Sequence, residues 1–156
     1  MSEVEKRVTA VLVAAGSSTR MGFDKLSFDL GGETVVQRSI RAFAECPLVD
    51  EIVLVAGKNR AFVEQQAVGC TKPVQIVAGG ATRAESAKNG VLAAHGELVA
   101  VHDAARPFVS PAVIAAVLLL LNTYPLLVSE DLVFRSKETN MTGSVSVVVY
   151  SLAGLN

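Results

Sequence analysis

The chain has 156 residues, of which 51% are hydrophobic and 19% are charged, and its formal net charge is -1 at pH 7. This length and composition predict one globular domain, and the near-neutral charge excludes the basic surface typical of nucleic-acid-binding proteins. The longest apolar run, Ala112 to Leu121, is too short to cross a bilayer, so we expect a cytoplasmic protein that does not enter the membrane. Cys46 and Cys70 lack metal-ligand spacing and are expected to be reduced thiols.

Strand-like apolar runs alternate with helical patterns along the chain. Strands are predicted at Val8 to Ala14, Ile52 to Ala56, Val74 to Val77 and Leu98 to Val101, and helices at Thr34 to Glu45, Asn59 to Gln66, Thr82 to His95 and Pro111 to Leu121. This order predicts an α/β fold, a Rossmann-like three-layer α/β/α sandwich with a mainly parallel sheet. The first and fourth strands are expected in its interior, and the alternating stretch Ser144 to Leu152 is a further candidate strand.

The loop after the first strand, Ala14 to Lys25, joins small residues to two cations, Arg20 and Lys25. Small residues let a ligand approach the backbone amides, so this composition favours a polyphosphate site over a solvated connection. A P-loop is excluded because Gly16 and Gly22 have five residues between them instead of four. The dinucleotide fingerprint is absent as well, since serines and a threonine occupy the middle of the loop.

A second glycine loop follows the third strand. Gly79 and Gly80 precede a helix that begins near Thr82, and Ser86 lies one turn into that helix. Glycines permit close approach of a ligand, the helix N-terminus favours an anion, and the Ser86 hydroxyl can read the edge of a pyrimidine. The alternative is a helix-capping turn in which Ser86 is packed or solvated.

The fourth strand ends in an acidic residue. Asp103 follows His102 and precedes two alanines, Ala104 and Ala105, and then Arg106. A carboxylate at the carboxyl end of a central strand is a candidate ligand for Mg²⁺ held against a triphosphate. Arg106 can bind a phosphate or form a surface ion pair, and we interpret His102 as a structural donor rather than a base.

Three segments in this order resemble the 2-C-methyl-D-erythritol 4-phosphate cytidylyltransferase family of nucleotidyltransferases. They run from Ala14-Ala15-Gly16 through Arg20-Met21 to Lys25, from Gly79-Gly80 through Arg83 to Ser86, and from Val101 to Pro107. The resemblance implies transfer of CMP from CTP to methylerythritol phosphate with release of pyrophosphate, Mg²⁺ as cofactor, and a role in non-mevalonate isoprenoid biosynthesis. A ribitol 5-phosphate cytidylyltransferase and a CTP-binding fragment with impaired catalysis are the alternatives.

The resemblance also implies roles for single residues. Arg20 and Lys25 would hold the triphosphate and the transition state, Asp103 would bind Mg²⁺, and Asp103 with Arg106 would receive the sugar-alcohol phosphate. The nucleotide would be bound at Ala14, Ala15, Gly16, Gly80, Ser86 and Ala104.

The family pattern ends near Val117. We therefore expect a single domain over residues 1–156, with a family-like nucleotide-binding part at 8–117 and an atypical tail at 118–156. A truncated or frame-shifted coding sequence is one hypothesis for the tail. Members of this family form homodimers through a projecting arm that this tail does not show, so the resemblance leaves a homodimer open here.

Overall fold

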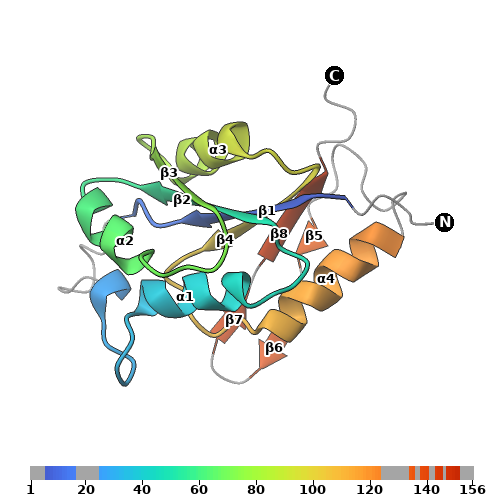
Figure 1. Cartoon of the computed structure of the whole chain (residues 1–156), viewed down its shortest axis with the longest axis horizontal. Coiled ribbons are helices and arrows are strands. Elements are labelled where there is room, and N and C mark those ends of the chain that lie inside the picture. The colour runs from blue at the N-terminus through green and yellow to red at the C-terminus, as the bar shows by residue number, and fades with distance from the viewer. Residues whose placement is uncertain are drawn as a thin grey trace.

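The fold is described by a computed structural model that covers the backbone of residues 6–16, 25–123, 134–135, 138–140, 143–145 and 147–151, and the side chains of 6–16 and 25–119. Strands and helices alternate over most of this length (Figure 1). The elements are β1 (Val8–Val13), η2 (Lys25–Ser27), α1 (Val35–Ala44), β2 (Glu51–Ala56), α2 (Arg60–Gln66), β3 (Val74–Ala78), α3 (Arg83–Ala93), β4 (Leu98–Asp103), α4 (Pro111–Thr123), β5 (Phe134–Arg135), β6 (Glu138–Asn140), β7 (Gly143–Val145) and β8 (Val147–Ser151).

The main sheet has the strand order β3-β2-β1-β4-β8-β5. The first four strands are parallel, and Val11 of β1 lies in register with Val53 of β2 and Val101 of β4. β8 pairs antiparallel with β4, and β5 pairs antiparallel with β8. The predicted interior positions of β1 and β4 and the strand within Ser144 to Leu152 are thereby confirmed. The order reverses between β1 and β4, which is where parallel sheets of this kind open a crevice for a ligand.

Alternate residues of β1 pack on opposite faces of the sheet, as the two-residue period of a strand requires. Leu12 belongs to the core beneath α1, α2 and α4, where Phe43 is fully buried. Val11 belongs to the core beneath α3, which approaches closely because Gly90 has no side chain to meet Val11. Helices therefore cover both faces, α3 on one and α1, α2 and α4 on the other (Figure 1), which confirms the predicted three-layer sandwich.

The helix boundaries follow from local chemistry. The Thr34 hydroxyl accepts a hydrogen bond from the Gln37 amide at 3.2 Å, and the Gln37 side chain accepts one from the Thr34 amide, so a capping box starts α1. Ser110 caps α4 by accepting from the Val113 amide at 3.2 Å, with Pro111 at the first helical position. Gly31 before α1 has a φ of 81°, the left-handed conformation that glycine adopts without strain.

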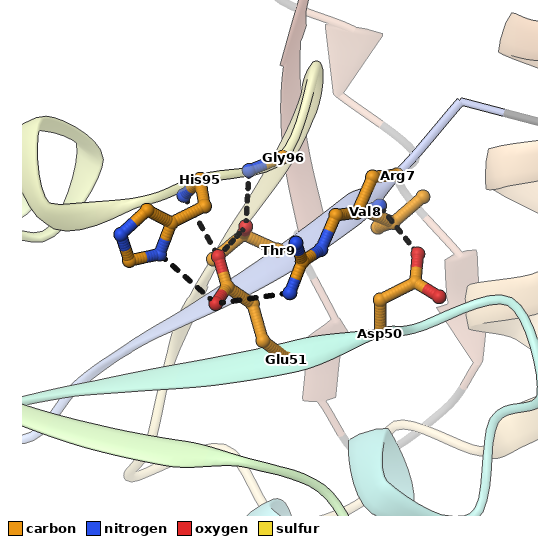
Figure 2. A network of polar contacts seen from close by, with 7 residues as sticks. All are labelled: Arg7, Val8, Thr9, Asp50, Glu51, His95 and Gly96. Carbon is orange, nitrogen blue, oxygen red and sulfur yellow. Dashed lines mark hydrogen bonds and ion pairs between the residues drawn. The ribbon is translucent and has the colours of Figure 1, made fainter.

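A polar network around the buried side chains of Thr9 and Glu51 (Figure 2) lies at the amino ends of β1 and β2. The switch point lies at the other end of these strands. The Thr9 hydroxyl donates to Glu51 at 2.6 Å and accepts from the Gly96 amide at 2.9 Å. Glu51 also accepts from the His95 amide at 2.7 Å, and its other oxygen lies 3.2 Å from His95 Nδ1 and 3.9 Å from the Arg7 guanidinium. This carboxylate is thus surrounded by donors although it is almost fully buried.

The pKa of the Glu51 carboxyl is lowered from its ordinary value of 4.5. Burial opposes ionisation, but the hydrogen bonds from the Thr9 hydroxyl and from the His95 amide and ring outweigh it. The ionised network therefore stabilises the fold at neutral pH and is lost on acidification.

Cys46 is buried and Cys70 is partly buried, and neither forms a disulfide within the described part of the chain. Across the residues that the structure describes, none of the helices has the length and apolar character needed to cross a membrane.

Candidate active site

A cavity of about 300 Å³ lies at the carboxyl ends of β1, β3 and β4. Three loops that are distant in the sequence form its walls, and all three were predicted as ligand-binding segments. The lining residues are Val13 at the end of β1 with Ala15 and Gly16 in the first loop, Gly80, Ala81 and Thr82 in the second loop with Arg83 and Ser86 in the first turn of α3, and Asp103 at the end of β4.

A larger cavity, of about 360 Å³, lies at the amino edge of the sheet and is lined in part by Arg7, Asp50, Leu98 and Leu119. Its size alone does not make it the functional site. The smaller cavity is the better candidate because it lies at the switch point of the sheet and is walled by glycine loops, a helix N-terminus and a carboxylate.

The first loop is fixed at Ala14. The Ala14 amide donates to the Val55 carbonyl at 2.8 Å, and the Asn59 side-chain amide donates to the Ala14 carbonyl at 2.9 Å. Ala15 then packs against the second loop, where a Cβ on Gly79 would lie 2.5 Å from Ala15 Cβ. The missing side chain of Gly79 therefore allows the two loops to meet.

The two cations predicted for this loop are not both placed. Arg20 lies outside the residues that the structure describes. Lys25 is exposed at the start of η2 and is not among the described residues that line the cavity. Their roles at a triphosphate stay predictions.

The second loop is closed by its own side chains. The Ser86 hydroxyl is buried and accepts from the Gly80 amide at 3.1 Å. Thr82 caps α3 by accepting from the Glu85 amide at 3.1 Å, and Glu85 in turn accepts from the Ala81 amide at 2.7 Å. Ser86 thus takes part in a turn before the helix, as the alternative of a capping turn with a packed Ser86 predicts. It also lines the cavity.

The third loop presents Asp103 between two arginines. The Asp103 Oδ2 lies 3.3 Å from Arg83 Nη1 and 4.0 Å from Arg106 Nε, while Oδ1 accepts from the Ala105 amide at 3.0 Å. The Asp103 side chain keeps 24% of its surface exposed, so it remains accessible from the cavity. Both arginines are more exposed than the carboxylate, at 67% for the Arg83 side chain and 40% for the Arg106 side chain.

The backbone of the third loop is held from beneath. Ala104 is fully buried, and its amide donates to the Val13 carbonyl at 3.0 Å while its carbonyl accepts from the Ser39 hydroxyl at 2.8 Å. His102 is buried with its ring Nε2 2.9 Å from the Arg106 carbonyl, which confirms its structural interpretation. The Ala104 side chain does not line the cavity, so a role of Ala104 in nucleotide binding stays a prediction.

Three residues at the site have roles that the sequence analysis missed. Arg83 is not a predicted site residue, although its place at the start of a helix after two glycines is a usable signal. Ser39 and Asn59 bond to carbonyls 65 and 45 positions away, and no local pattern indicates such contacts.

The donors at the cavity limit which metal the site can hold. No cluster of three or more His, Cys, Asp or Glu side chains occurs within the described part of the chain. A metal ion at Asp103 would therefore need most of its ligands from water and from a bound phosphate.

The described residues define the class as an α/β sandwich with a cavity at the switch point of its sheet, a fold that solved nucleotidyltransferases share. The 4-diphosphocytidyl-2C-methyl-D-erythritol synthase of Anaerococcus prevotii DSM 20548 has a TM-score of 0.69 over 96% of this chain and 73% of that one, at 20% identity. A nucleotidyl transferase of Methanothermobacter thermautotroptrophicus has a TM-score of 0.65 over 94% of this chain and 72% of that one, at 23% identity. At these identities the likeness shows the fold.

The sequence shows the family. The model of the family IspD, 2-C-methyl-D-erythritol 4-phosphate cytidylyltransferase, matches residues 8–133, and the chain belongs to this family. The match continues beyond Val117, where the sequence analysis expected it to end.

Two relatives show what share of their own length the match to this chain covers. The bifunctional enzyme IspD/IspF of Anaeromyxobacter sp. (strain Fw109-5) is 44% identical over 117 residues, which cover 72% of this chain and 30% of that protein. The 2-C-methyl-D-erythritol 4-phosphate cytidylyltransferase of Symbiobacterium thermophilum is 44% identical over 118 residues, which cover 71% of this chain and 48% of that protein. The chain thus spans less than half the length of these relatives.

Proposed function

We propose that this chain binds CTP in the cavity at the carboxyl ends of β1, β3 and β4 and transfers CMP to 2-C-methyl-D-erythritol 4-phosphate, with release of pyrophosphate. The main support for this proposal is that the three predicted loops meet at one cavity. The chain is also a member of this family. A homodimer, as implied by the resemblance, and a cytoplasmic location stay predictions.

The geometry of Ser86 supports recognition of a pyrimidine. Its hydroxyl oxygen accepts from the Gly80 amide, so the hydroxyl hydrogen is left to donate to an acceptor on the base, such as the cytosine carbonyl. The first two loops are in contact between Ala15 and Gly79, and this closeness favours a single-ring base over a purine. The backbone of Ala14, Gly16 and Ala104 would complete the nucleotide site.

The chemistry of Asp103 fits a magnesium ion. Mg²⁺ prefers oxygen ligands and is commonly bound by one or two carboxylates together with water and substrate phosphates. Asp103 supplies one accessible carboxylate, and the ion would neutralise charge on the phosphates. A structure of Rv0371C from Mycobacterium tuberculosis, with 19% identity and a TM-score of 0.61, is a complex with manganese, and a similar divalent ion is proposed here.

The reaction requires positioning and charge neutralisation. A phosphate oxygen of the acceptor forms a bond to the α-phosphorus of CTP, and the bond from that phosphorus to the bridging oxygen breaks, so pyrophosphate leaves with the electron pair. The acceptor phosphate is already ionised, and no base is needed. Arg20 and Lys25 would stabilise the triphosphate, and Arg106 would orient the acceptor.

Calorimetric titration of the chain with CTP, UTP and ATP in the presence of Mg²⁺ tests the binding step. We expect CTP to bind more tightly than ATP, with UTP the closer competitor, and equal affinity for ATP would contradict the proposed pocket. Pyrophosphate release with methylerythritol phosphate and with ribitol 5-phosphate then identifies the acceptor. CTP binding without release from either would indicate a nucleotide-binding fragment with impaired catalysis.

A further inference from the structure

We propose that Asn59 is a positioning residue that fixes the nucleotide-binding loop after β1. The consequence for CTP affinity rests on the proposed function, whereas the effect on the loop does not. Asn59 precedes α2 and lies outside the lining of the cavity within the described part of the chain.

The side chain of Asn59 joins two loops that leave neighbouring strands. Its Nδ2 donates to the Ala14 carbonyl at 2.9 Å, and its Oδ1 accepts from the Gly57 amide at 3.1 Å. Ala14 follows β1 and Gly57 follows β2, so one amide group connects the carboxyl ends of both strands. An asparagine is suited to this bridge because its amide offers a donor and an acceptor at once.

Asn59 does not use its side chain in the way expected from its position. It is the N-cap residue of α2, where an asparagine oxygen usually accepts from the helix's own first amides. Its side chain makes no such bond, and its backbone has φ and ψ of -86° and 15° instead of an extended conformation. The amide is thus committed to the loops and not to the helix.

The bridge acts on the part of the loop that meets the ligand. Ala15 and Gly16, the residues directly after Ala14, line the cavity. The Ala15 carbonyl lies 3.1 Å from where a Cβ on Gly57 would be, so the two loops also touch through their backbones. Holding the Ala14 carbonyl therefore limits how far Ala15 and Gly16 can move.

Two substitutions of Asn59 separate its hydrogen bond to Ala14 from its hydrogen bond to Gly57. Asn59→Ala removes both hydrogen bonds. Asn59→Asp keeps the acceptor for Gly57 and a side chain that suits a helix N-cap, but it replaces the donor to Ala14 by a carboxylate oxygen. Lys72→Met is the matched control, because it removes a side-chain bond of 2.7 Å to the Val49 carbonyl at the opposite edge of the sheet.

Hydrogen exchange of the Ala14 amide, which is bonded to the Val55 carbonyl, reports on the loop without any ligand. We expect exchange to be roughly 3- to 10-fold faster in both Asn59 variants, the effect of losing the bond to the Ala14 carbonyl that both variants lack, and unchanged in Lys72→Met. Unchanged exchange in the Asn59 variants would overturn the proposal whether or not CTP binds.

Titration with CTP and with CMP gives the functional half of the test. We expect both Asn59 variants to bind both nucleotides roughly 3- to 10-fold more weakly, again the effect of losing the shared bond to the Ala14 carbonyl. If only Asn59→Asp lost affinity, and lost more for CTP than for CMP, the new carboxylate would be repelling the phosphates. That result would contradict the proposal. Faster exchange with unchanged affinity would contradict it too, while faster exchange in a chain that does not bind CTP would reject the proposed function and keep the loop-fixing role.

Discussion

Replacing Gly79 with alanine tests the contact that brings the first and second loops together. The backbone of Gly79 does not require glycine, because its φ is not positive, so the added methyl group acts through space alone. A Cβ at this position would lie 2.5 Å from Ala15 Cβ and 2.9 Å from Ser86 Oγ. Since carbon atoms in contact are about 3.5–4.0 Å apart, the first loop would have to move by about 1 Å.

Overpacking of this kind costs about 1–3 kcal/mol. For a chain of this length, each kcal/mol lowers the Tm by about 2–4 °C. We therefore expect Gly79→Ala to lower the free energy of unfolding in urea and to weaken CTP binding, since the displaced residue lines the cavity.

Gly16→Ala is the matched control for stability, because a Cβ there has no described atom within 4 Å. Its free energy of unfolding should stay within about 0.5 kcal/mol of the parent chain. If Gly79→Ala were as stable as Gly16→Ala and bound CTP like the parent, the packing of the two loops described here would be wrong.

Three further outcomes are expected. Asp103→Asn should lower Mg²⁺-dependent pyrophosphate release by about 100-fold or more, and an unchanged rate would contradict the metal assignment. Arg106→Ala should raise the KM of the acceptor more than that of CTP, and an equal rise would remove its acceptor role. Because the pKa of Glu51 is lowered on folding from 4.5, its stabilisation is present above that pH and is lost as the pH falls through the folded value. Thr9→Val should therefore cost about 1–3 kcal/mol in urea unfolding at about pH 7 and less at about pH 3, whereas an equal cost at both would contradict the linkage.

The layered fold could be predicted because its signals are local. The apolar run that forms β1 and the serine and proline that start α4 each lie within a few residues of the element they define. The alternation after Ser144 predicted a strand, but its antiparallel pairing with β4 depends on long-range hydrogen bonds that no local pattern encodes. The family resemblance added site residues that spacing alone would not assign.

Part of the site could be predicted because ligand-binding residues are expected near the carboxyl ends of parallel strands. This expectation selected Gly16, Ser86 and Asp103, and all three line one cavity. The residues that hold the loops were not predictable in the same way. Asn59 looks like an ordinary helix cap in the sequence, and Ser39 looks like any serine on a helix, because their partners become neighbours only in the folded chain.

An NMR titration of the chain with CTP and Mg²⁺ is the sharpest test of a single nucleotide site in this cavity, because it locates the ligand while measuring its affinity. We expect the amides of Gly16, Gly80 and Asp103 to shift together along one saturable curve, with ATP causing smaller changes at the same concentrations. Shifts confined to the amino-edge cavity near Arg7 and Leu98, or three loops that respond with different affinities, would contradict a single nucleotide site at the carboxyl ends of β1, β3 and β4.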